Sequence, residues 1–178
     1  MTTKDQKQPV RLAEHFAASS KFKDLFTGGM DLVEETAAFL DGEGRESAKA
    51  LSKTASALYG SESMRLTTRL MQLASWLLLQ RAVGEGEMTV QQAVDEKKNV
   101  KLSQFPTRRT GAGWDEMPES FTSLIDRSVA LQRRILNLDQ EIYGSENQEE
   151  AEPASNPVAS QRALLETAFD PLVKKQSN

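Results

Sequence analysis

The chain has 178 residues, of which 38% are hydrophobic and 27% charged, and its formal net charge is −4 at pH 7. This length allows one domain of ordinary size plus additional chain outside its core. The chain contains no cysteine, which excludes a disulfide scaffold, a thiol nucleophile and a cysteine metal site. Proteins that coat phosphates usually carry a basic excess, so the acidic balance argues against nucleic acid as a partner.

The N-terminal residues 1–9 are polar and end at Pro9, which predicts a disordered start without the apolar region of a signal peptide. A short helical turn is predicted over residues 10–18. The most apolar stretch, residues 70–83, contains polar side chains and is shorter than the roughly 18–20 residues that a membrane span needs. We therefore expect a cytoplasmic protein with no membrane contact.

The first strong helix is predicted over residues 20–40, with Ser20 as its N-terminal cap. Its apolar residues recur every three or four positions, which is typical of one helix face. That predicted stripe consists of Phe22, Phe26, Met30, Val33, Ala37 and Leu40. Gly28 and Gly29 interrupt the pattern, so either a neighbouring helix approaches closely there or the helix begins only after them.

The second and longest helix is predicted over residues 52–83, and a leucine stripe marks its main buried face: Leu66, Leu70, Leu73 and Leu77. Its C-terminal end is apolar on most sides, and a small bundle has difficulty covering such a helix alone. This end is therefore the predicted centre of the core or a homodimer interface. The candidate residues are Trp76, Leu77, Leu78 and Leu79.

Thr89 and Gln92 have capping-box spacing, which predicts a short helix.

Between residues 97 and 117 the apolar periodicity is lost, which predicts a long basic loop. Loops of this length in compact domains are often functional, so we expect either a docking surface for an acidic partner or a solvated connection. The candidate partner-binding residues are Lys97, Lys98, Lys101, Phe105, Arg108, Arg109 and Trp114.

The third helix is predicted over residues 118–143, where apolar and small residues repeat with heptad-like spacing. The stripe consists of Leu124, Ser128, Leu131, Ile135, Leu138 and Ile142. Together the helices predict an all-α fold, a three-helix bundle over residues 10–144.

The C-terminal segment, residues 145–178, is predicted to be a disordered acidic tail because its first part is rich in Glu, Asn, Ser and Pro. A short apolar motif follows within it: Leu164, Leu165, Phe169, Leu172 and Val173. Two interpretations of this motif stay open. It is either a linear recognition motif beyond a tether or a fourth short helix that folds back on the bundle.

The sequence offers no constellation for catalysis. The single histidine, His15, lies near the N-terminus, and no Glu-x-x-His motif accompanies the best carboxylate pair, Glu34 and Glu35. Glu62, Arg65 and Arg69 have the spacing of intrahelical ion pairs. We expect no catalytic residue, no metal site and no cofactor, and hence a protein that is not an enzyme.

Two stretches carry a family resemblance: residues 30–41 (MDLVEETAAFLD) and residues 63–83 (SMRLTTRLMQLASWLLLQRAV). They resemble the bacterial family named for the regulator of CtrA degradation, with a looser match from Leu12 to Ile142. The resemblance implies a small three-helix protein that dimerises. It also implies a non-enzymatic adaptor that delivers cell-cycle regulators to the ClpXP protease.

The same resemblance implies the partners. These are the ClpX unfoldase primed by a single-domain response regulator, CtrA-type substrate proteins, and a cyclic-di-GMP-binding co-adaptor. We expect the helical bundle to bind substrates or partner adaptors and the flexible tail to bind the unfoldase. The competing hypotheses are a helical dimeric scaffold and a DNA-associated regulator that uses the basic loop at residues 97–109.

Overall fold

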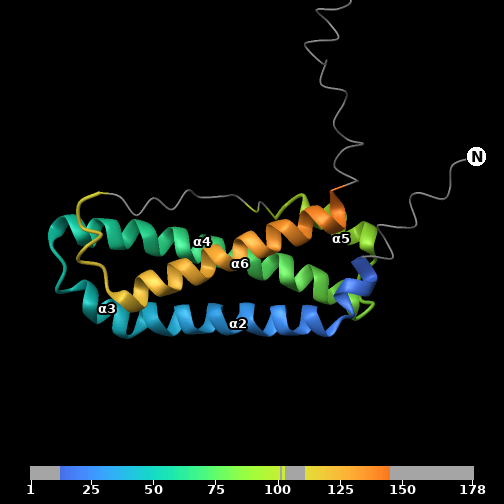
Figure 1. The fold of residues 1–178 in the computed structure, drawn as a ribbon, viewed down its shortest axis with the longest axis horizontal. Helices are drawn as coiled ribbons and strands as arrows, with labels where there is room; N and C mark the ends of the chain where they lie inside the picture. Colours follow the sequence, from blue (N-terminus) through green and yellow to red (C-terminus); the bar gives the residue numbers. More distant parts are fainter. Residues whose placement is uncertain (1–12, 101, 103–110, 145–178) are drawn as a thin grey trace, which may run out of the picture. The chain divides into compact units, whose positions relative to one another are not determined.

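The structure is a computed structural model that describes residues 13–100, 102 and 111–144 (Figure 1). Within these ranges the regular structure is helical and contains no strand, so the all-α prediction is confirmed for this part of the chain. The chain divides into two units, Met1–Tyr143 and Gly144–Asn178. The predictions of a disordered N-terminus at residues 1–9 and of a tail at residues 145–178 lie outside the described residues.

In the described part of the chain, residues 13–17 form a helical turn, and five helices follow. They are α2 (Ser20–Asp41), α3 (Glu43–Ala48), α4 (Lys53–Gly84), α5 (Val90–Lys97) and α6 (Glu119–Tyr143). The three long helices, α2, α4 and α6, lie within a residue or two of their predicted bounds. The short α3 was not predicted. Its first turn carries Glu43 and Glu46, whose negative charges stabilise a helix N-terminus.

Hydroxyl side chains cap three of the helices. The N-terminal cap of α2 is Ser19, whose Oγ accepts a hydrogen bond from the Phe22 N–H at 3.2 Å, so the prediction of Ser20 was wrong by one residue. Ser52 caps α4 and also bonds Glu116: its N–H and Oγ donate to the carboxylate at 3.0 and 2.8 Å. The predicted capping box that opens α5 is confirmed.

The three long helices pack against one another, and α4 runs parallel to α6 (Figure 1). Two side-chain hydrogen bonds establish this direction, because Arg69 pairs with Ser128 and, further along both helices, Gln80 pairs with Tyr143. Two parallel helices require the chain to return along their length between them. This topology explains why a long connection separates α5 from α6.

The buried face of α2 differs from the predicted stripe. Its buried residues are Phe22, Leu25, Gly29, Leu32, Thr36 and Phe39. Phe26, Met30 and Val33, which were predicted to be core, are only half-buried on the flank of the helix. The helix runs unbroken through Gly28 and Gly29, so the interpretation that it begins after them was wrong.

Gly29 marks the closest approach of α2 to α4. A Cβ atom at this position would lie 2.5 Å from Leu77 Cδ1, whereas a Cβ at Gly28 would meet nothing within 4 Å. The interpretation that a neighbouring helix approaches closely is therefore confirmed for the second glycine of the pair.

The core consists of two apolar clusters. The first includes Trp76, Leu77 and Ile135. The second is built around aromatic rings, with the Tyr59 and Phe121 centroids 4.5 Å apart. The predicted leucine stripe of α4 is buried across both clusters, so α4 is the helix that the others cover.

Candidate partner-binding surface

An exposed row of large apolar side chains lies on α4. Met64, Met71 and Leu78 are 73%, 65% and 52% exposed. They are spaced seven residues apart, which places them in one line, two helical turns from one to the next. Single exposed apolar residues are common, but an aligned row of them marks a candidate interaction surface. We refer to Met64, Met71 and Leu78 as the α4 ridge.

The four residues at the apolar end of α4, Trp76 to Leu79, were predicted as one surface but differ in their exposure to solvent. Trp76 and Leu77 are fully buried in the protein's own core, Leu79 is half-buried, and Leu78 faces outward. Trp76 also donates its indole N–H to Asp139 at 2.8 Å. Trp76 and Leu77 are therefore core residues, and only Leu78 of the four belongs to an exposed apolar surface.

The half-buried flank of α2 adjoins the end of the α4 ridge. Leu78 and Arg81 are three residues apart and thus neighbours on the surface of α4. The Arg81 guanidinium lies over the Phe26 ring, 5.2 Å from its centroid. The two helices therefore present Leu78, Arg81 and Phe26 side by side.

Lys97, the first residue of the predicted basic loop, is used within the fold. Its Nζ lies 3.0 Å from both carboxylate oxygens of Asp139 and 4.4 Å from the Tyr143 ring centroid. Its side chain is only 12% exposed. Lys98, by contrast, is exposed and lies 3.5 Å from Asp95. The Lys97 charge is thus compensated within the fold, whereas Lys98 pairs with Asp95 at the exposed surface.

Trp114, at the other end of the predicted loop, is half-buried and packs against the second core cluster. The remaining loop candidates, Lys101, Phe105, Arg108 and Arg109, lie outside the described residues. The apolar tail motif also lies outside them, with its members Leu164, Leu165, Phe169, Leu172 and Val173. These residues remain predictions.

A buried polar contact joins α4 to α6. Arg69 is 1% exposed, and its Nη1 donates to Ser128 Oγ at 2.8 Å. Burial lowers the pKa of Arg69, and the nearby Glu62 charge opposes this effect. Glu62 pairs with Arg65 at 2.8 Å, as its spacing predicted. Arg69 also reaches between the helices, where its hydrogen bond to Ser128 links α4 to α6.

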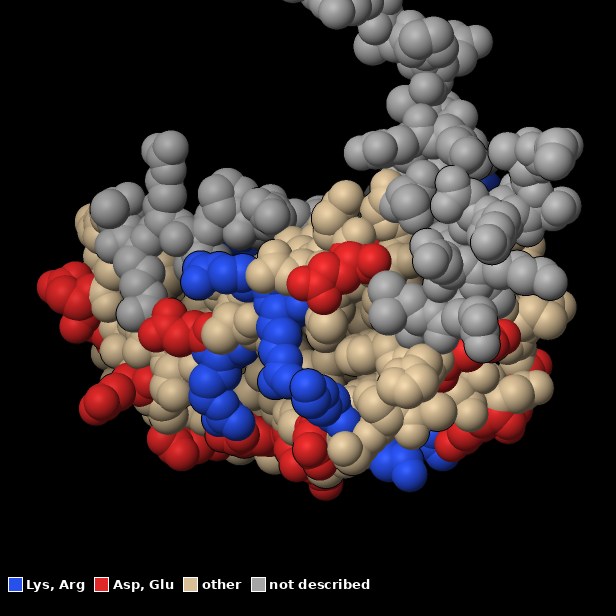
Figure 2. Space-filling view, turned by 45° about the vertical axis from the view of Figure 1, so that its right-hand side comes forward, with Lys and Arg blue, Asp and Glu red and all other residues tan. Residues whose placement is uncertain are grey.

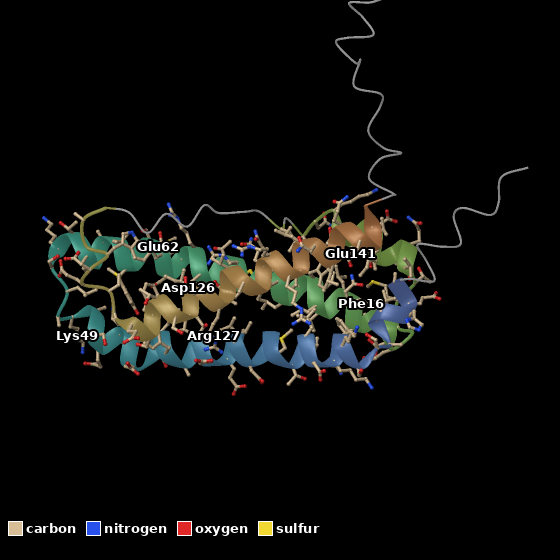
Figure 3. The ribbon with its side chains drawn as sticks, viewed as in Figure 1. Phe16, Lys49, Glu62, Asp126, Arg127 and Glu141 are labelled. Carbon is tan, nitrogen blue, oxygen red and sulfur yellow. The ribbon has the colours of Figure 1, made fainter. Side chains whose placement is uncertain are left out.

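The predicted carboxylate pair on α2 also has a structural partner. Glu35 accepts a hydrogen bond at 2.6 Å from Arg127 of α6, which Figure 3 labels, and this bond lowers the pKa of Glu35. Glu34 and His15 are exposed. Among the described residues, no three His, Asp or Glu side chains are grouped to hold a metal ion. No helix in the same ranges is long and apolar enough to cross a membrane.

Charges of both signs lie on the face of the molecule shown in Figure 2. A band of Lys and Arg side chains crosses the middle of this face, with Asp and Glu side chains around it. Interspersed charges of this kind are typical of folded domains in general. The described part thus defines an all-helical protein with an exposed apolar row on its central helix.

The comparisons place this protein in a family. The model of the family described as "Protein of unknown function (DUF1465)" matches residues 13–169. The chain belongs to this family, and the match includes Leu164, Leu165 and Phe169 of the predicted tail motif.

A solved structure is similar to the chain. The crystal structure of RcdA from Caulobacter crescentus CB15 is 46% identical, with a TM-score of 0.60. The similarity covers 73% of this chain and 97% of that chain. The resemblance to the family named for the regulator of CtrA degradation is therefore confirmed. No curated protein matches the chain significantly.

Proposed function

We propose that this protein is a non-enzymatic adaptor that delivers cell-cycle regulators to the ClpXP protease for degradation. The observation that carries this proposal is the 46% identity to RcdA over 97% of that protein's chain. Sequence identity at this level across almost the whole of that chain favours a shared biochemical role. An adaptor needs only binding surfaces, and the proposal assigns no catalytic residue and no cofactor.

The proposed partners are the ClpX unfoldase primed by a response regulator, CtrA-type substrate proteins and a cyclic-di-GMP-binding co-adaptor. In this proposal the helical domain binds substrates or the co-adaptor, and the segment 145–178 binds the unfoldase in the cytoplasm. A flexible tether can supply effective concentrations near the millimolar scale, so weak individual contacts suffice for delivery.

Reconstituted degradation tests the proposal. Purified ClpX, ClpP, the response regulator and the co-adaptor are mixed with a CtrA-type substrate, and substrate loss is followed with and without this protein. One variant lacks residues 145–178, and a second reverses the charges of Lys98, Lys101, Arg108 and Arg109. Lys97 is left unchanged because Asp139 already holds it in the fold. Reversal of the exposed Arg133 and Arg134 on α6 is the matched control.

We expect the wild type and the α6 control to accelerate substrate loss and the tail deletion to abolish that acceleration. If the wild type leaves substrate loss unchanged with every partner present, the adaptor proposal is wrong. DNA binding by the wild type that weakens steeply with salt and is lost with the loop reversal would instead favour the DNA-associated regulator.

We further propose that the protein is a homodimer whose two copies meet through the α4 ridge. A row of large side chains at intervals of seven residues has the spacing of a helix–helix seam. Small residues flank it, with Thr68, Ser75 and Ala82 each four residues after a ridge residue. In a two-fold interface the same surface serves both copies, so one copy's ridge can pack on the other's small residues. This assignment replaces the predicted interface at Trp76 and Leu77.

A further inference from the structure

A cavity lies between the first turns of α2 and the last turns of α4. Its volume is about 510 Å³, within the usual range for ligand pockets, and it is open to solvent. The lining includes the rings of Phe22 and Phe26 from α2, and Lys23 and Arg81 stand beside them. An aromatic floor thus lies next to two cationic side chains.

The walls of this cavity are fixed by close packing. The Phe22 ring packs against Phe26 and against Phe16, which Figure 3 labels, with centroids 6.1 and 5.6 Å apart. At the base of the cavity, a Cβ atom on Gly84 would lie 2.6 Å from the carbonyl oxygen of Ala17. The absence of a side chain at Gly84 therefore lets the helical turn at residues 13–17 reach α4.

Two contacts orient the half-exposed side chain of Arg81. Its Nε donates to Glu85 at 2.7 Å, and its guanidinium lies over the Phe26 ring, 5.2 Å from the centroid. Within the described part of the chain, its two Nη nitrogens donate to no other residue. An Arg fixed through Nε presents its Nη groups as a planar pair of donors, the geometry that binds a carboxylate with two parallel hydrogen bonds.

The lining of the cavity carries a net positive charge, because Lys23 and Arg81 outnumber its one acidic residue, Glu85. Lys23 also lies in the first turn of α2, at the positive end of the helix dipole, and this turn contains no acidic residue. Lys23 forms no ion pair with any described residue. A lysine at this end of a helix is mildly unfavourable for the isolated helix, because its positive charge lies near the positive end of the helix dipole. The negative charge of an acidic partner would be attracted to both.

We propose that this cavity docks a segment of a partner protein in which an acidic residue adjoins bulky apolar residues. The carboxylate binds the Arg81 Nη pair and lies near Lys23, while the apolar side chain contacts the Phe22 and Phe26 rings. Leu78 of the α4 ridge is a surface neighbour of Arg81, so the docked segment borders the dimer seam proposed above and does not extend along it. The inference depends on the proposed adaptor function in one respect: a partner protein supplies the docked segment.

Peptide binding to the full-length protein tests this inference without any protease. The probes are two fluorescein-labelled pools of ten-residue synthetic peptides. In the acidic pool Asp or Glu is flanked by Leu and Phe, and in the amide pool Asn or Gln replaces each acid. Fluorescence polarisation is measured for wild type, Arg81→Gln and Arg81→Lys. Arg134→Gln on α6 is the control, because Arg134 is also an exposed helical arginine.

We expect the acidic pool to bind the wild type and Arg134→Gln equally, and the amide pool to bind about tenfold more weakly. Arg81→Gln should weaken binding of the acidic pool by about tenfold, and Arg81→Lys nearly as much, because lysine keeps the charge but loses the paired donors. Circular dichroism confirms that the variants remain helical.

Three results would overturn the inference. They are equal binding of both pools, binding of the acidic pool that Arg81→Gln leaves unchanged, and no binding of either pool at about 1 mM peptide. None of these results depends on proteolysis. A failed degradation assay combined with Arg81-dependent peptide binding would therefore reject the adaptor function but support docking at the cavity. Competition with acetate distinguishes docking of the peptide from binding of a carboxylate group alone. We expect that acetate does not displace the peptides.

Discussion

The ammonium nitrogen of Lys97 lies 3.0 Å from both carboxylate oxygens of Asp139, and this pair fastens the end of α5 to α6. The same carboxylate accepts the indole N–H of Trp76 at 2.8 Å, so α4 is included in the contact. The Lys97 and Asp139 side chains are only 12% and 18% exposed, which reduces solvent screening of their interaction. A lysine that the sequence assigned to partner binding therefore stabilises the fold.

Replacing Asp139 with alanine should lower the free energy of unfolding by about 2–3 kcal/mol, because both Lys97 and the Trp76 N–H lose their partner in a half-buried site. Urea unfolding measures the change. Glu141→Ala is the matched control, since Glu141 is an exposed acid of the same helix (Figure 3) and should alter stability by less than about 0.5 kcal/mol. Equal losses in the two variants would contradict the assigned role of Asp139.

The neighbouring glycines of α2 should respond in opposite directions to alanine. Gly28→Ala should stabilise the protein by about 0.5–1 kcal/mol, because alanine favours the helix and its Cβ meets nothing. Gly29→Ala should destabilise it by about 1–2 kcal/mol, since its Cβ would lie 2.5 Å from Leu77 Cδ1 and force that side chain to move. Chemical unfolding of both variants measures the effects, and a stabilising Gly29→Ala would refute the close approach.

The Glu35–Arg127 pair should make a small, pH-dependent contribution to stability. The hydrogen bond from Arg127 lowers the pKa of Glu35 below its ordinary value of 4.5. The contribution is therefore present above that ordinary pKa and is lost as the pH falls through the lower folded-state pKa. Both side chains are about half exposed, so solvent screening limits the contribution to about 0.5 kcal/mol.

Unfolding of Glu35→Gln and wild type at about pH 7 and about pH 3 measures this difference, which should be present at the higher pH and shrink at the lower. Glu34→Gln is the control, because Glu34 is the exposed neighbour on α2 and forms no ion pair with a described residue. A Glu35→Gln effect that is independent of pH would show that the charge of Glu35 is not its cause.

The α4 ridge yields a prediction about association. Met71 lies at the centre of the row, so in an antiparallel two-fold seam the two copies of Met71 face each other. Met71→Lys should raise the dimer dissociation constant at least about tenfold, because it places two like charges together in an apolar contact. Sedimentation equilibrium measures this. Ala130→Lys, at an exposed position of α6, should leave the constant unchanged, and a Met71→Lys protein that associates as the wild type does would rule out this seam.

Much of the helical organisation could be predicted from local sequence. The long helices carry apolar residues at helical spacing, and their caps and breakers lie close to the observed ends. The exact buried face of α2 could not be predicted this way, because the true face includes Gly29 and Thr36 while Phe26 and Met30 offer a more apolar alternative. The close approach of Leu77 to Gly29 determines which face of α2 is buried, and Leu77 lies on a helix almost 50 residues further along the chain.

The contacts of the candidate site also could not be predicted from local sequence. Nothing near Lys97 indicates that its partner is Asp139, because that residue follows 42 positions later on another helix. The α4 ridge did carry a signal in its interval of seven residues, but Trp76 and Leu77 obscured it because they make the same stretch apolar all round. Only packing separates the side chains that the core covers from those left outside it.

Ser52 has a consequence for how this family can vary. Its hydroxyl accepts the Ala55 N–H to cap α4 and at the same time donates to Glu116. Aspartate could replace the first function but would repel Glu116, whereas serine, threonine and asparagine can each accept the N–H and donate to the carboxylate. In an alignment of relatives the two positions should therefore change together: serine, threonine or asparagine at 52 wherever 116 is acidic, and aspartate at 52 only where the acid at 116 has been replaced.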